Sequence, residues 1–206
     1  MEPVIFIFSI GILIMSIIAH EVSHGYVANM LGDPTARLAG RLTLNPIPHL
    51  DIVGSFIVPV ATFFLGGFIF GWAKPVPYNP YNMKNPNRDG ALVAAAGPFA
   101  NILIAVVFTG LIRFAPALGL PASFIEIASI VVFLNILLAF FNLVPVPPLD
   151  GSKILFALLP YRMGFIQEFL ERYWFVAIFI LILFLWRLFL PLIFFLFEAL
   201  TGLPFV

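Results

Sequence analysis

Two histidines and a glutamate form the cluster of residues in this sequence best suited to metal chemistry. They lie in His20-Glu21-Val22-Ser23-His24, an HExxH run. Residues four apart on an α-helix share one face, about one turn from each other, so two imidazoles at this spacing can hold one zinc ion. The glutamate can then lie beside the metal and activate its water. The motif predicts a zinc site; the alternative is a polar cluster that only hydrogen-bonds neighbouring helices.

The segment around this motif has the composition of a membrane-spanning helix. No ionisable residue occurs from Pro3 to Ala19, and the apolar helical pattern continues to Leu31, before the stop signal at residues 32–34. A charge at the centre of a membrane helix costs about 2.5–3.5 kcal/mol on insertion scales. Ionisable groups retained at that cost indicate a functional site.

The composition of the whole chain predicts an integral membrane protein. Of 206 residues, 62% are hydrophobic and 10% charged, with a mean hydropathy of +1.11. The formal charge of zero gives no indication of a nucleic-acid partner. The absence of cysteine excludes disulfides and thiolate ligands, so a metal must be bound by histidine and carboxylate. The N-terminus has no positively charged region typical of a cleavable signal peptide, and residues 1–206 are expected to form a single transmembrane domain.

Three further stretches have the length and apolarity of spanning helices: about 91–113, 122–142 and 173–190. Pro191 is expected to interrupt the last of them, and residues 192–206 are left unassigned. The stretch 160–172 is amphipathic and is expected to lie along the membrane surface. In the second helix, Gly97 allows close approach of a neighbour, and Asn101 either bonds between helices or hydrogen-bonds into the metal site.

Residues 52–72 are long enough to cross the membrane, but Pro59 and several glycines interrupt them. If this segment is re-entrant, eight of the ten lysines and arginines share one side, as the positive-inside rule expects. We therefore expect re-entry. The predicted fold class is an all-α polytopic membrane protein of about four to six transmembrane helices, with a re-entrant segment and a broken metal-binding helix.

Asp150 lies in a helix break. Three prolines and a glycine occur around it in residues 143–151, amid apolar residues, which is typical of a broken helix that presents an acid inward. Alternatively, Asp150 only caps the following helix, Ser152–Leu159. His49 and Asp51, in the polar segment 33–51, are rival metal ligands; the alternative is that they are ordinary loop residues.

Prolines alternate in the stretch Gly71–Tyr78, which favours an extended strand with one edge poor in donors. The free edge of such a strand, at Lys74, Pro75 and Val76, could pair with an extended peptide. A rigid interfacial turn is the alternative.

Several motifs together resemble the site-2 protease family of intramembrane zinc metalloproteases. They are HEVSH, AAAGPFAN and NLVPVPPLDG, with GWAKPVP matching bacterial members, and they cover about residues 15–155 in order. The resemblance implies that His20, His24 and Asp150 bind one zinc ion, with Glu21 as general base and acid. It also implies that Asn142 lies near the metal to bind substrate or stabilise the oxyanion. Many relatives carry a PDZ or CBS domain, and this chain has neither.

The expected function is that of a zinc endopeptidase which cleaves transmembrane segments with metal-activated water. Two imidazoles and one carboxylate leave a fourth coordination position open, as in catalytic zinc sites. Asn142, or else Asn101, would donate to the oxyanion, and residues 72–78 would hold the unwound peptide. The expected partners are a transmembrane protein or peptide and the lipid bilayer, with no nucleic acid, in a prokaryotic inner membrane. The alternatives are a zinc or ion transporter and an inactive protein that binds membrane helices.

Overall fold

The computed structural model describes residues 3–51, 53–58, 61, 64, 74–181, 183 and 186–204. The described chain is helical and contains no β-strand. Three helices are long and apolar enough to cross a membrane: Ile7–Met30 within α1 (Pro3–Met30), α4 (Pro86–Phe114) and α5 (Ala122–Asn142). This confirms the predicted all-α membrane class.

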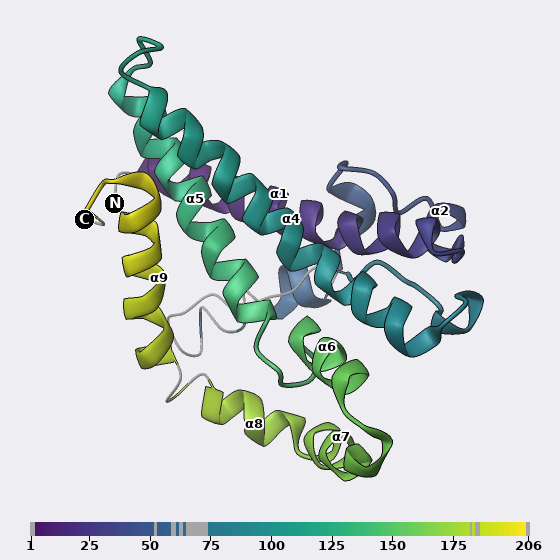
Figure 1. The fold of residues 1–206 in the computed structure, drawn as a ribbon. Coiled ribbons are helices and arrows are strands. Elements are labelled where there is room, and N and C mark those ends of the chain that lie inside the picture. The colour runs from purple at the N-terminus through teal and green to yellow at the C-terminus, as the bar shows by residue number, and fades with distance from the viewer. Residues whose placement is uncertain are drawn as a thin grey trace.

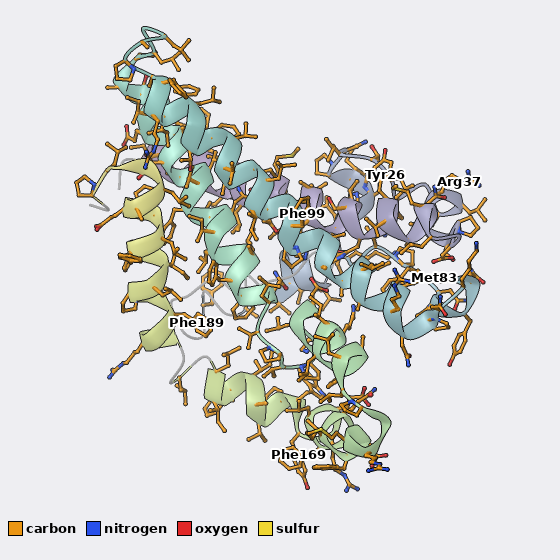
Figure 2. All side chains as sticks on the ribbon, in the orientation of Figure 1. Tyr26, Arg37, Met83, Phe99, Phe169 and Phe189 are labelled. Atoms are coloured by element: carbon orange, nitrogen blue, oxygen red, sulfur yellow. The ribbon has the colours of Figure 1, made fainter. Side chains whose placement is uncertain are left out.

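Helix α4 packs against both α1 and α5 (Figure 1). It begins at Pro86, several residues before the predicted start at 91, because proline at the first helical position has no amide that needs a partner. Its buried residues include the small residues Ala94, Gly97 and Ala105, and several of its large apolar side chains are exposed. Phe99, for example, projects from α4 and is exposed (Figure 2), as expected of a side chain that faces lipid.

The described residues between α1 and α4 include four short helical segments, namely α2 (Thr35–Leu38), η1 (Ile47–His49), the π-helical turn η2 (Val53–Ile57) and η3 (Pro80–Asn82). Most of the predicted re-entrant stretch 52–72 lies outside the described residues, so its path stays a prediction. Residues 71–73 of the predicted strand also lie outside them. Residues 74–79 are described, and they form no strand.

The predicted break after the third spanning helix is present. Helix α5 ends at Asn142, and α6 (Asp150–Leu158) begins after seven irregular residues, two residues before the predicted Ser152. Gly151 is required here because a Cβ at this position would lie 2.2 Å from the carbonyl oxygen of Leu143. The close backbone approach fixes where the acid at the start of α6 points.

The C-terminal region differs from the prediction. The short helix η4 (Tyr161–Met163) and α7 (Gly164–Arg172) occupy the predicted amphipathic stretch, and α8 (Trp174–Ile180) and α9 (Trp186–Thr201) follow (Figure 1). Helix α9 continues through Pro191, so the prediction that Pro191 interrupts the last spanning helix is wrong. Residues 182, 184 and 185 lie outside the described residues, so a single helix over 173–190 stays a prediction.

Tertiary packing explains why α9 continues through Pro191. Ile193 and Phe197 are almost fully buried in an apolar cluster with residues of α4 and α5, and this packing outweighs the single hydrogen bond that proline removes. At the end of α9, Arg113 of α4 donates to the carbonyl oxygens of Leu200 (2.6 Å) and Ala199 (2.9 Å). These bonds satisfy two of the last carbonyls of the helix.

Asp33 joins the end of α1 to the segment that precedes α4. Its buried carboxylate accepts hydrogen bonds from the backbone N–H of Asn79 (2.6 Å) and the amide of Asn82 (2.7 Å), and from the backbone and hydroxyl of Thr35. Burial disfavours the charged form, but the bonds from Thr35, Asn82 and Asn79 outweigh it and hold the pKa of Asp33 below its usual value. The charged carboxylate therefore stabilises this junction.

We expect Asp33→Asn to lower the free energy of unfolding by about 2 kcal/mol at neutral pH, because an uncharged amide replaces a buried, charged acceptor. Thermal unfolding in detergent micelles measures this difference. Because the pKa is lowered in the folded state, the stabilisation is present above the usual pKa of aspartate and is lost as the pH falls through the lowered one. The gap between wild type and variant should close over that acidic range. A gap that is absent at pH 7 would contradict the prediction.

Candidate metal centre

Helices α1 and α6 bring His20, His24 and Asp150 together. The Nε2 atom of His20 lies 3.0 Å from Oδ2 of Asp150, and Nε2 of His24 lies 3.1 Å from the same oxygen. The three residues are 5%, 8% and 7% exposed. Residues 130 positions apart in the sequence thus meet in a buried cluster.

The local structure explains this meeting. The histidines are one turn apart on α1, and their ring centroids are 4.7 Å apart. Asp150 is the first residue of α6, and Leu149 occupies the N-cap position, so Asp150 does not act as the cap. Its carboxylate faces the imidazoles, and the capping alternative is wrong.

Gly97 of α4 lies directly against the two imidazoles. A Cβ at this position would lie 2.5 Å from Cε1 and Nε2 of His20 and 2.6 Å from Cε1 of His24. Only glycine leaves room for both rings in these positions. The sequence indicated close helix approach at Gly97, but nothing in it identified the histidines as the neighbours.

Hydrogen bonds on the far side of each ring fix the histidine tautomers. Nδ1 of His20 lies 2.6 Å from Oδ1 of Asn101, and Nδ1 of His24 lies 2.6 Å from the carbonyl oxygen of Val93. Both oxygens can only accept, so both Nδ1 atoms carry the proton. In the neutral rings, each Nε2 therefore presents a lone pair to the Asp150 carboxylate. Three acceptors that converge in this way fit a shared cation.

A buried polar chain supports His20 from behind. The amide of Asn101 donates to Oδ1 of Asn135 (2.8 Å), whose own amide donates to Oγ of Ser16 (2.9 Å). Both asparagines are fully buried. Asn101 thus combines both of its expected roles, the bond between helices and the bond to the metal site. No surface of Asn101 is exposed to a substrate. Asn135 was detectable only as a polar residue in an apolar helix.

Glu21 lies beside this cluster. Ligand atoms of His20, Glu21 and His24 lie within 4.8 Å of one another. Oε2 of Glu21 accepts a hydrogen bond from the backbone N–H of Val76 at 2.8 Å. Glu21 is half-buried, and this bond orients its carboxylate.

The other predicted ligands and site residues have partners elsewhere. His49 is buried, and its Nε2 donates to the carbonyl of Thr43 at 2.9 Å; Asp51 accepts from the N–H of Gly54 at 2.6 Å. Neither belongs to the histidine cluster of the described chain. The amide of Asn142 donates to the carbonyl of Leu138 in its own helix (3.0 Å). Its role at the oxyanion stays a prediction.

Residues 74–76 lie against α1 at the metal centre. The carbonyl oxygens of Lys74 and Pro75 accept hydrogen bonds from Arg41, and Val76 binds Glu21 as described above. Sequence reasoning missed Arg41, which carried no signal beyond its place in a polar loop. Peptide binding by these three residues stays a prediction.

Comparison with known proteins gives consistent matches. The family model described as peptidase family M50 matches residues 120–185. The chain is 40% identical over 175 residues to "Putative zinc metalloprotease YwhC" of Bacillus subtilis, and the aligned region covers 82% of this chain and 77% of that protein. Identity to "Putative zinc metalloprotease Rip2" of Mycolicibacterium smegmatis is 34% over 149 residues, which are 71% of this chain and 55% of that protein.

An archaeal relative extends these matches. Identity to MJ0611 of Methanocaldococcus jannaschii, also described as a zinc metalloprotease of this kind, is 31% over 158 residues, or 72% of each chain. No solved structure matches the chain significantly. Together with the family match, the relative from Bacillus subtilis places the sequence: the chain belongs to peptidase family M50, the site-2 protease family.

Proposed function

We propose that the protein is a zinc-dependent endopeptidase that cleaves membrane-embedded segments of other proteins. One observation carries this proposal: the Asp150 carboxylate of α6 converges with two histidine lone pairs of the spanning helix α1, beside Glu21. Three protein ligands with an adjacent glutamate are typical of catalytic rather than structural zinc sites. The names of the relatives support the same metal and activity.

His20, His24 and Asp150 are the residues that would hold the zinc ion. Their donor set suits zinc, since imidazole nitrogen and carboxylate oxygen are both common zinc ligands. When bound, zinc supplies a Lewis acid that polarises a peptide carbonyl and acidifies water. Asn101 and the carbonyl of Val93 hold the two rings in the tautomer that binding requires.

Glu21 would act as the general base and then as the general acid. Its carboxylate would take a proton from the attacking water and return it to the leaving amine. The N–H of Val76 donates to Oε2, which fixes the direction in which the carboxylate points. We propose that Asn142 donates to the oxyanion through the second N–H of its amide, since the bond to the Leu138 carbonyl uses only one of the two.

The depth of the site indicates the class of substrate. At 1.5 Å per residue, His20 lies about 20 Å from the start of the span Ile7–Met30 and about 15 Å from its end. This is near the middle of a hydrocarbon core about 30 Å thick. The substrate would therefore be a membrane-embedded segment, cleaved in a prokaryotic cell membrane by the single domain 1–206.

Transport of zinc is less well supported. A transport path needs several ligating groups along its length, and the described chain contains one such cluster, at His20, Glu21 and His24. We therefore propose no transport function.

Glu21→Gln should reduce cleavage of a transmembrane peptide by about 100-fold or more, because glutamine cannot accept the proton. Zinc binding should persist, since all three ligands remain. Cleavage by detergent-purified protein, with zinc content measured on the same sample, tests both points. Glu168→Gln, at an exposed position of α7, is the matched control and should retain activity. Full cleavage by Glu21→Gln would refute the endopeptidase mechanism.

Gly97→Ala should weaken zinc affinity about tenfold or more, because the added methyl group displaces both imidazoles. Gly90→Ala is a matched control on the same helix, since a Cβ at position 90 meets nothing within 4 Å. Competition with a zinc chelator measures the affinity, and circular dichroism confirms that both variants remain helical. Equal affinity in the two variants would mean that the rings are not confined as described.

A further inference from the structure

Arg41 is a buried cation close to the catalytic glutamate. It follows α2 and is 6% exposed. Its Nη2 atom donates to the carbonyl oxygens of Lys74 (2.6 Å) and Pro75 (3.2 Å), and no partner is described for its Nε. A buried guanidinium is costly unless its neighbours compensate for the lost water. A guanidinium buried at this cost indicates that the segment it binds, at Lys74 and Pro75, has a role in the protein.

The contact with Pro75 connects Arg41 to Glu21 through one peptide unit. The carbonyl of Pro75 and the N–H of Val76 are the two ends of the same peptide group. Arg41 donates to the oxygen end, and the hydrogen end donates to Oε2 of Glu21. The peptide dipole therefore has its negative end at the cation and its positive end at the carboxylate. Hydrogen bonds in such a chain strengthen one another in a site of low dielectric.

Other contacts hold this peptide in place. The N–H of Lys74 donates to the carbonyl of His49 at 2.9 Å, and the ring of Pro75 fixes the backbone φ before the bonded amide. The Val76 side chain is buried, and Gly25 of α1 leaves the room for it, since a Cβ there would lie 2.8 Å from Cγ1 of Val76. The segment is thus fixed on α1 one turn beyond Glu21.

We propose that Arg41 is a positioning residue for the general base, acting through the Pro75–Val76 peptide. This inference rests on the proposed endopeptidase function. Arg41 has no described contact with His20, His24 or Asp150, so its loss should change catalysis and leave metal binding intact. Removal of the guanidinium frees the peptide to rotate, and the Glu21 carboxylate then loses its fixed direction.

The test compares Arg41→Ala and Arg41→Lys with Arg37→Ala. Arg37 belongs to the same loop region but is exposed, at the outer end of the molecule in Figure 2. With a transmembrane peptide as substrate, Arg41→Ala should lower kcat about 10- to 100-fold, with zinc affinity unchanged. Lysine keeps a cationic donor and should restore most of kcat. Arg37→Ala should match the wild type.

Hydrogen exchange gives a readout that is independent of cleavage. Pro75 and Pro77 have no amide hydrogen, so Val76 supplies the only exchangeable amide of residues 75–77. Exchange at this amide should be faster in Arg41→Ala than in the wild type or Arg37→Ala. It should return toward the wild-type rate in Arg41→Lys. Arg41→Met, which keeps the length of the side chain and has no donor, replaces the alanine variant if that variant does not fold.

The outcomes separate this inference from the proposed function. The endopeptidase stands if the wild type cleaves and Glu21→Gln does not. If Arg41→Ala then keeps both the wild-type kcat and the slow exchange at Val76, the inference on Arg41 is overturned. A rise in kcat in Arg41→Ala would also overturn it, because residues 74–76 would then restrain the base. If the wild type does not cleave any peptide while exchange responds as expected, the proposed function fails and the structural link between Arg41 and Val76 stands.

Discussion

The structure depends on one electrostatic constraint: three buried acceptor groups face one another beside a helix long and apolar enough to cross a membrane. The Nε2 atoms of two buried imidazoles lie 3.0 and 3.1 Å from one buried carboxylate oxygen. Such a cluster is stable only if a positive charge is shared among them and the surrounding protein fixes their directions. The close approach of α4 at Gly97, the break before α6 and the hydrogen bonds behind each ring all serve this arrangement.

Local patterns in the sequence predicted much of the fold. The apolar stretches predicted the three long helices, and α5 has its predicted bounds. A membrane requires long apolar segments whose backbone N–H and C=O groups bond to one another, which makes such helices visible in the sequence. The histidine spacing and the proline-flanked Asp150 identified the candidate ligands, since both signals are contained within a few residues. That Asp150 meets His20, 130 positions away, was inferred from the family resemblance rather than from either pattern alone.

The features that the sequence did not predict depend on contacts between distant segments. Pro191 predicts the end of a helix locally, but the packing of Ile193 and Phe197 carries α9 through it. Arg41 looks like an ordinary loop cation, and only the folded chain places it against the Pro75 carbonyl. Side-chain periodicity contains no information about such pairs, because it reports which face of one element is buried and not what covers that face.

The groups behind His20 differ from those common in soluble zinc enzymes. There a carboxylate often accepts from the ligating imidazole and raises its basicity, whereas here the acceptor is the amide of Asn101, backed by Asn135 and Ser16. An uncharged acceptor orients the ring without adding a further negative charge to the bilayer interior. It also leaves the imidazole a weaker electron donor, so an ion bound to this ring would keep more of its electron-withdrawing strength for the carbonyl that it polarises.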